Sequence, residues 1–208
     1  FKGMKTWVEK VWSKKTLFEL FEDRDVSHGV YTEDPVSLTS IVNGPFKNEC
    51  VVHTGADLSK FKKHVKKGSL PQYCFIEPKF YGQHNDQHPS SVSGLIDGPT
   101  RAGTVILGEK LIWDVYETIR NSSYKHKTLF IITHDEHGGC FDHVVPGSAV
   151  PPEQEGKTQK NFPFDRLGIR VPMVMISSHI PEGSIINETF DHTSFIATMC
   201  KKFSMPSL

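Results

Sequence analysis

Apolar residues recur in helical and strand-like patterns along the first third of the chain. Thr16 and Glu19 have the spacing of a capping box, which predicts a short helix from there to about Arg24. Residues 26–31 are compatible with a strand. A second short helix is predicted around residues 58–65 and ends at Gly68, because glycine readily adopts the left-handed conformation that closes helices.

From residue 72 onward the pattern is typical of an α/β protein. Compact apolar runs at residues 72–77, 128–133 and 170–177 predict three buried strands. The second run is continuous rather than alternating, as in parallel strands. We therefore expect a mixed, mostly parallel sheet that is covered by helices.

Two longer helices and one long loop complete the predicted elements. A helix is predicted over residues 103–120, with one apolar face made of Val105, Ile112, Val115, Tyr116 and Ile119. Another begins near Asp191 or Thr193 and directs Phe195, Ile196, Met199 and Phe203 inward. Residues 144–164 hold four prolines and are predicted to form a surface loop.

Composition and charge exclude several classes of protein. The 208 residues are 37% hydrophobic and 23% charged, which excludes a disordered tail, a collagen or a disulfide knot. Lysine plus arginine equals aspartate plus glutamate at 24 each, so we expect no nucleic-acid partner. No apolar run approaches the ~18 residues of a membrane span, so we expect no transmembrane segment. Transient contact with a membrane surface is left open. The oligomeric state is left open.

The start of the chain and its cysteines bear on its origin. The chain opens at Phe1, without Met or a leader pattern, and we expect it to be an excerpt of a longer protein. The cysteines lie far apart and form no CxxC pair, which argues against a zinc ribbon and leaves their disulfide state open; they are Cys50, Cys74, Cys140 and Cys200. Sequons at Asn121 and Asn187 are compatible with export.

Three polar clusters lie at predicted strand ends or at a helix start. They are Glu77 with residues 84–89, residues 134–143, and residues 190–194. Ligands and catalytic groups of open α/β sheets gather beyond the carboxyl ends of the strands. Aspartate, glutamate and histidine are the residue types that bind divalent metals and transfer protons.

The second cluster gives the strongest indication of a site. Asp135 and Glu136 directly follow a strand, where two adjacent carboxylates repel each other unless a cation lies beside them. The alternative is a polar loop with solvated carboxylates, but the density of histidine and carboxylate favours a site. Gly138 and Gly139 allow a sharp turn, and Asp142 with His143 could orient the first layer of ligands.

Cys140 lies within the second cluster and has two interpretations. A nucleophilic thiol needs a partner base, which His137 or His143 could supply. A buried structural cysteine is the interpretation we favour.

The first and third clusters are weaker when taken alone. His88 could act as a general acid or contact phosphate, with Asp86 orienting it or joining a metal shell, whereas the alternative is an ordinary surface loop. In the third cluster, Asp191 or Thr193 is expected to cap a helix, and a functional role for His192 is the minority view.

Taken together, the motifs resemble a known family. They are Glu77-Pro78, Asn85-Asp86-Gln87-His88-Pro89, Gly108-Glu109, Asp135 through Val144, Arg170-Val171-Pro172 and Asp191-His192-Thr193-Ser194. In this order they resemble the phosphoesterase family, which contains non-specific phospholipases C and acid phosphatases. The resemblance implies a partial alkaline-phosphatase-like α/β/α sandwich, with residues 1–208 as a single domain that lacks its amino-terminal half.

The resemblance also implies roles for individual residues. Asp135 and Glu136 match metal-holding positions for a divalent ion whose identity is open, and His88, Asp86 and His137 match catalytic positions in the phosphate pocket. Asn85, His143 and His192 are assigned to substrate binding. The implied reaction cleaves a phosphate ester or phospholipid through a phospho-enzyme. The family is largely exported, which implies a secreted or extracytoplasmic location.

The departures from the family pattern keep other functions open. The family's nucleophilic Ser or Thr and a Glu-Asn metal-binding pair are not found in this sequence, so the nucleophile is expected outside this chain. One alternative is a truncated, non-catalytic fragment that binds metal or a partner. Another is a metal-dependent nuclease, which neutral charge disfavours, or a sulfatase-like hydrolase, for which the motif is absent.

Overall fold

The computed structural model describes residues 15–43, 51–88, 104–151 and 161–208. The chain divides into two compact units, one made of Phe1–Thr128 with Ile185–Leu208 and the other of Leu129–Ser184. Each unit contains its own sheet, of three strands in the first and of two in the second. The expected single domain over residues 1–208 stays a prediction.

The first unit is built on a parallel sheet of β1 (His28–Thr32), β2 (Val52–Thr54) and β3 (Tyr73–Ile76). The strand order is β2-β1-β3, and both neighbours of β1 run parallel to it. Every residue of β1 is buried, whereas β3 is only half-buried and exposes Phe75. The α/β class with a mostly parallel sheet is therefore confirmed, and β1 and β3 lie where strands were predicted.

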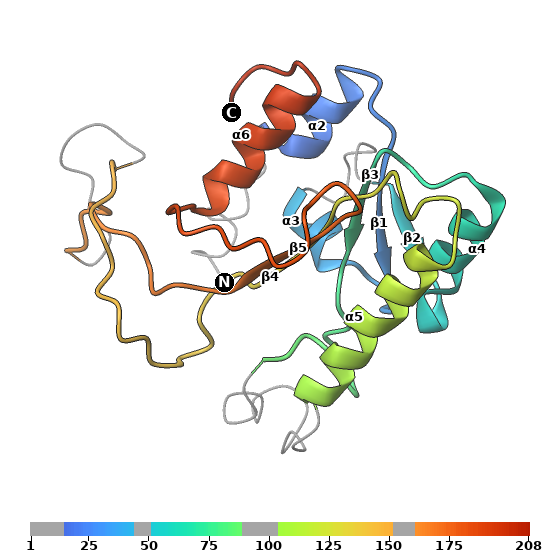
Figure 1. Cartoon of the computed structure of the whole chain (residues 1–208), viewed down its shortest axis with the longest axis horizontal. Coiled ribbons are helices and arrows are strands. Elements are labelled where there is room, and N and C mark those ends of the chain that lie inside the picture. Colours follow the sequence, from blue (N-terminus) through green and yellow to red (C-terminus); the bar gives the residue numbers. More distant parts are fainter. Residues whose placement is uncertain (1–14, 44–50, 89–103, 152–160) are drawn as a thin grey trace, which may run out of the picture. The chain divides into compact units, whose positions relative to one another are not determined.

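Helices α2 (Leu17–Glu22) and α6 (His192–Lys202) share a hydrophobic core with β1. Val30 of β1 packs into this cluster, and the rings of Phe21 and Phe203 meet edge to face at 5.7 Å. Figure 1 shows the two helices side by side. The predicted capping box of α2 is present, because Thr16 accepts from the Glu19 amide and Glu19 accepts from the Thr16 amide.

Helices α4 (Ser59–Lys67) and α5 (Thr104–Arg120) contact each other, and α4 also contacts β2 (Figure 1). Successive side chains of a strand point to opposite faces, so Tyr31 leaves the sheet on the side away from Val30 and meets the Phe61 ring of α4 at 5.4 Å. Helices therefore cover both faces of the sheet. Gly68 ends α4 with φ of 70°, as predicted.

Two details of the first unit differ from the sequence prediction. Val105 was expected on the inner face of α5, but its side chain is 58% exposed, and Val115 is the buried residue of that face. The short strand β2, helix α3 (Leu38–Asn43) and the single turn η1 (Ala56–Leu58) were not predicted.

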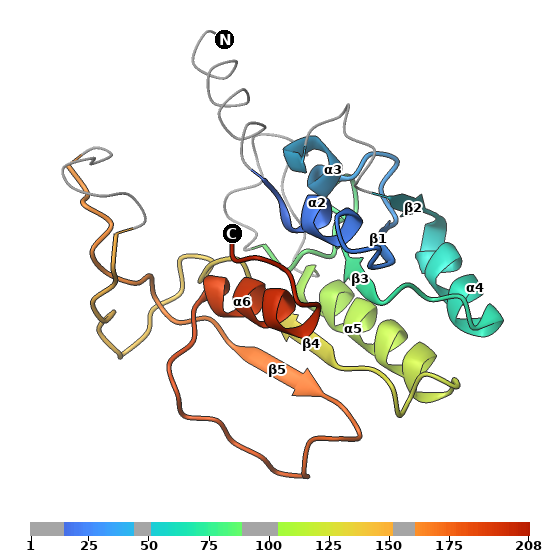
Figure 2. The ribbon, with the colours of Figure 1, turned by 90° about the horizontal axis from the view of Figure 1, so that it is seen from above.

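The second unit contains a two-stranded antiparallel ribbon (Figure 2). Strand β4 (Phe130–Thr133) pairs with β5 (Met173–Ile176), with Phe130 opposite Ile176 and Thr133 opposite Met173. The parallel pairing suggested for residues 128–133 is therefore wrong for this pair. The expected burial is wrong as well, because no described residue of Leu129–Ser184 is buried. A continuous apolar run indicates a strand, but it determines neither which strand pairs with it nor whether other elements bury it.

Three of the four cysteines fall within the described residues, and all three are free thiols. Burial raises the pKa of the Cys74 thiol to about 12, so this thiol stays protonated at neutral pH. Cys50 lies outside the described residues. Across the described ranges, none of the helices has the length and apolar character needed to cross a membrane.

Tyr31, His53 and His64 form an aromatic cluster behind the sheet. The Tyr31 ring stacks on His53 at 4.8 Å, and its hydroxyl lies 2.7 Å from Nδ1 of His64. Burial lowers the pKa of His53 below its usual 6.5, and the neighbouring His64 and Lys60 lower it further. The folded chain therefore resists protonation of His53 more than the unfolded chain does.

This cluster predicts a specific loss of stability in acid. The unfolded chain binds more protons at His53 as the pH falls below about 6.5, so the free energy of unfolding should decrease from that pH down to the lower folded pKa. Thermal unfolding followed by circular dichroism between pH 7.5 and 5 should show a shallower slope for His53→Gln than for the wild type. The exposed His126→Gln control should keep the wild-type slope, and equal slopes for all three proteins would contradict the prediction.

Candidate functional site

The carboxyl ends of β1 and β3 lie side by side and carry the first group of polar residues. The strand order β2-β1-β3 sends the chain from β1 to one side and then back across it to β3. Ligands of open α/β sheets bind beyond the carboxyl ends of strands where the connections change direction. Asp34 follows β1 and Glu77 follows β3 at this edge, and both are buried.

Glu77 is a buried carboxylate that holds the start of α3. Its side chain accepts hydrogen bonds from the Ser37 hydroxyl at 2.9 Å, from the amides of Leu38 at 3.1 Å and Thr39 at 2.8 Å, and from the Thr39 hydroxyl. Buried charge is tolerated when its lone pairs are satisfied in this way. Glu77 is therefore a structural residue that fixes the chain after β1 to the end of β3.

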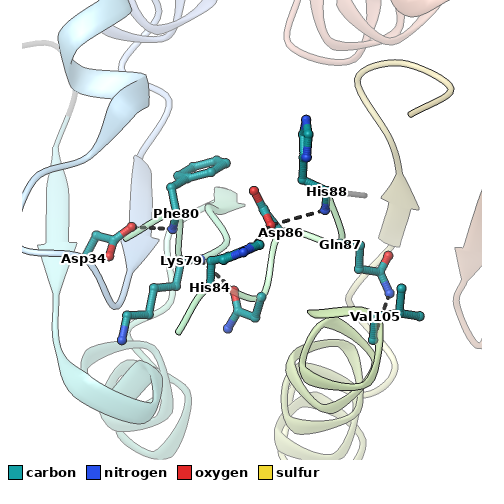
Figure 3. Close-up of polar contacts among 9 residues, drawn as sticks. Asp34, Lys79, Phe80, His84, Asp86, Gln87, His88 and Val105 are labelled. Carbon is teal, nitrogen blue, oxygen red and sulfur yellow. Dashed lines mark hydrogen bonds and ion pairs between the residues drawn. The ribbon is translucent and has the colours of Figure 1, made fainter. Parts of the chain in front are cut away.

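Asp34 anchors the loop that follows β3. Its Oδ2 accepts from the Phe80 amide at 2.7 Å, and Asp34 is fully buried (Figure 3). The loop is also closed on itself, because the Lys79 amide donates to Oδ1 of Asn85 at 2.6 Å and the Asn85 amide donates back to the Lys79 carbonyl at 3.0 Å. The Asn85 side chain, predicted to bind substrate, thus holds the loop closed.

The far end of the same loop carries Asp86 and His88. Oδ1 of Asp86 lies 2.6 Å from Nδ1 of His84 and accepts from the His88 amide at 3.2 Å (Figure 3). Gln87 contacts α5, with its Nε2 3.3 Å from the Val105 carbonyl. Gly108 of α5 permits this approach, since a Cβ there would lie 2.3 Å from Cγ of Gln87.

The side chains of His84, Asp86 and His88 differ in their exposure to solvent. His88 is exposed and Asp86 is half-buried, so both are placed where a substrate could reach them. His84 is only 6% exposed. The functional roles of Asp86 and His88 stay predictions, and no role was predicted from the sequence for buried His84 or for Asp34, which anchors the loop.

Asp135 and Glu136 begin a tight turn after β4, as predicted. Oδ1 of Asp135 accepts from the Glu136 amide at 2.9 Å, and Oε2 of Glu136 accepts from the Gly138 amide at 2.8 Å. Both side chains are exposed. Each carboxylate keeps its second oxygen, Oδ2 or Oε1, without a hydrogen bond to any described residue, and hard divalent cations prefer such oxygens.

The two glycines make this turn possible. Gly138 and Gly139 have φ of 62° and 74°, which a side chain would strain. His137 closes the turn, with its Nδ1 3.0 Å from the Cys140 carbonyl. Cys140 itself is exposed, so the expectation of a buried structural cysteine is wrong; the turn carries it outward.

Asp142 is clamped by Arg170, which lies just before β5. Nε of Arg170 donates to Oδ2 at 2.7 Å and Nη2 donates to Oδ1 at 2.9 Å. The Arg170 guanidinium, together with the Val144 amide, holds the pKa of Asp142 far below its usual value. His143 lies 3.5 Å from Asp142, and its side chain is 83% exposed. This fork ties the turn after β4 to the start of β5.

The third cluster behaves as a helix cap. Asp191 precedes α6 and accepts from the Ser194 amide at 3.0 Å and from the Thr193 hydroxyl at 2.6 Å. These bonds, led by the one from Thr193, lower the pKa of Asp191. The capping interpretation is confirmed, and His192 is an exposed residue of the first turn.

The predicted site residues thus fall into two groups. Asn85, Asp86 and His88 lie on one loop of the first unit, and His192 lies on α6 of the same unit. The other predicted residues lie in the second unit; they are Asp135, Glu136, His137 and His143. Within the described part of the chain, no three His, Cys, Asp or Glu side chains form a metal-binding group. The role of Asp135 and Glu136 as metal ligands stays a prediction.

Comparison with known proteins adds independent information. The sequence model of the Phosphoesterase family matches residues 3–206. Non-specific phospholipase C6 of Arabidopsis thaliana is 32% identical over 209 residues, covering 93% of this chain and 38% of that protein. Non-specific phospholipase C4 of the same plant is 34% identical over 207 residues, covering 92% of this chain and 36% of that protein.

A bacterial relative extends the comparison. Phospholipase C A of Mycobacterium tuberculosis (strain CDC 1551 / Oshkosh) is 25% identical over 223 residues, covering 93% of this chain and 40% of that protein. The chain thus spans well under half the length of the curated relatives that it matches.

The contacts of Glu77 predict a large effect of removing its charge. Glu77→Gln replaces one acceptor oxygen by an amide group that cannot accept from the donors around it, so the free energy of unfolding should fall by about 2 kcal/mol. Urea denaturation followed by fluorescence measures this change. The exposed Glu182→Gln variant is the control, and an equal effect of the two substitutions would show that the Glu77 bonds contribute nothing.

The fork between Asp142 and Arg170 predicts local protection of the loop. Arg170→Ala should speed hydrogen exchange at the Val144 amide, which donates to Asp142, by about threefold, and Arg170→Lys should have a smaller effect because lysine cannot form the fork. Arg166→Ala removes another exposed arginine of the unit and should leave this amide unchanged. Unaltered exchange in Arg170→Ala is the outcome that would refute the clamp.

Proposed function

Because the chain belongs to the phosphoesterase family, we propose that it forms part of a phospholipase C-type hydrolase of phosphate esters. The match across residues 3–206 carries this proposal, since it includes every residue that the motifs single out. The substrate is a phospholipid or a smaller phosphate ester. An acid phosphatase activity is covered by the same chemistry, and an extracytoplasmic location is proposed with it.

Asp135 and Glu136 are proposed to hold a divalent metal ion. The second oxygen of each carboxylate supports this role, because only one oxygen of each accepts a hydrogen bond from a backbone amide of the turn. A bound divalent cation would neutralise charge on the phosphoryl oxygens. The Asp142 fork and the two glycines keep the turn in the conformation that presents both carboxylates.

Asp86 and His88 are proposed to act on the phosphoryl group. His88 is exposed at the end of a closed loop and can give a proton to the leaving alcohol. Asn85 keeps this loop closed. Nδ1 of His137 faces the Cys140 carbonyl, and Nε2 on the other edge of the ring is proposed to donate to a phosphate oxygen in the doubly protonated imidazolium form. His143 and His192 are exposed and are proposed as further substrate contacts.

The proposed reaction passes through a phospho-enzyme. The hydroxyl oxygen of a Ser or Thr outside this chain bonds to phosphorus and gives up its proton to a base. The bond from phosphorus to the leaving oxygen breaks, and the leaving oxygen takes a proton from His88 and departs as the alcohol. Water then attacks phosphorus, releases phosphate or a phosphorylated head group, and restores the hydroxyl. The second candidate is a truncated, non-catalytic fragment that binds metal or a partner.

The proposal is tested with the complete reading frame that contains this chain. The protein should hydrolyse p-nitrophenyl phosphate or phosphatidylcholine, and a chelator should abolish this activity. An Asp135→Ala, Glu136→Ala double variant should lose about 100-fold or more of kcat/KM because two proposed metal ligands are removed.

A matched control removes a carboxylate of the same unit. Glu182→Ala lies on an exposed loop and should retain wild-type activity. Full activity of the double variant would refute the metal role of Asp135 and Glu136. Absence of any phosphate ester hydrolysis by the metal-loaded complete protein would favour the non-catalytic candidate.

A further inference from the structure

A buried histidine that the proposed reaction does not use lies against one of its residues. His84 is 6% exposed, and its Nδ1 lies 2.6 Å from Oδ1 of Asp86. Its other ring nitrogen, Nε2, is buried and has no hydrogen-bond partner among the residues that the structure describes. Most buried polar atoms are paired, so an exception calls for a functional or structural reason.

The contact between His84 and Asp86 determines where each proton and lone pair lies. Because a carboxylate oxygen accepts, we assign the hydrogen of this bond to Nδ1 of His84. Oδ1 of Asp86 accepts a second time, from the His88 amide at 3.2 Å. Both of these bonds use the same oxygen, and Oδ2 forms no hydrogen bond within the described part of the chain.

The loop around His84 leaves the ring little freedom. The residues just before it are fixed by the bond from the Phe80 amide to buried Asp34 and by the pair of bonds between Lys79 and Asn85. Figure 3 shows the His84 ring turned toward Asp86 inside this frame, with the His88 side chain directed away from it. Because its backbone is fixed and its ring is buried, His84 donates the hydrogen bond to Asp86 from a fixed position.

We propose that His84 is a positioning residue that acts through Asp86. By occupying Oδ1 it fixes the Asp86 carboxylate so that Oδ2 is presented to a hydroxyl or cationic group of the bound substrate. Nε2 of His84 is itself buried, so His84 exerts this effect without touching the substrate. This inference rests on the proposed function, in which Asp86 belongs to the phosphate pocket.

Two substitutions separate the donor from the shape of the ring. The amide nitrogen of asparagine occupies the place of Nδ1, whereas that of glutamine occupies the place of Nε2. His84→Asn should therefore keep the bond to Asp86, and His84→Gln should lose it. In the complete enzyme, His84→Gln should lower kcat by about 10- to 100-fold with little change in KM, and His84→Asn should restore most of that loss.

A second readout does not depend on activity. In NMR spectra of the chain, ¹⁵N shifts of His84 should report a proton on Nδ1, and the His88 amide resonance should move in His84→Gln but stay in His84→Asn. The exposed His126→Gln control should change neither the resonance nor kcat. Thermal unfolding by circular dichroism establishes that each variant is folded.

The outcomes distinguish this inference from the function on which it rests. If the complete enzyme hydrolyses no phosphate ester yet the NMR pattern is as expected, the contact stands and its catalytic role is overturned together with the proposed function. A proton on Nε2 instead of Nδ1 would overturn the inference alone. Equal kcat losses in His84→Asn and His84→Gln would also overturn it, because the donor position would then be irrelevant.

Discussion

The buried carboxylate of Glu77 is the contact on which the arrangement of the first unit depends. It lies at the carboxyl end of β3 and accepts every hydrogen bond that residues 37–39 offer it, some forty residues earlier in the chain. A buried carboxylate without these donors would be very costly, so strand and helix start must be placed together. The loop with Asp86 and His88 continues directly from this fixed point.

The sequence predicted those elements whose determinants are local. Thr16 and Asp191 cap their helices with neighbouring residues, and Gly68 ends α4 through its own backbone freedom. Helix α3 was missed because the acceptor at its start is Glu77, which is distant in sequence. Parallel pairing was wrongly predicted for β4 for a similar reason, since an apolar run does not indicate which strand pairs with it or in which direction.

The candidate site was predictable in location and less so in detail. Motif residues after β3 and β4 were found where the strands end, because polar residues directly after an apolar run mark that edge. Burial is what separates His84 from His88 and Asp34 from an ordinary turn residue, and burial is decided by residues elsewhere in the fold. The Asp-Pro dipeptide at Asp34, directly after a predicted strand, is the one local signal that could have drawn attention to that carboxylate.

The β4–β5 ribbon has no buried residue of its own among those described. Two strands with half-exposed apolar side chains are too little to fold independently in water. The segment that bears Asp135 and Glu136 therefore cannot be moved between genes as a self-sufficient module. A graft of this acidic pair into another protein would need a host that covers the apolar side chains of the ribbon.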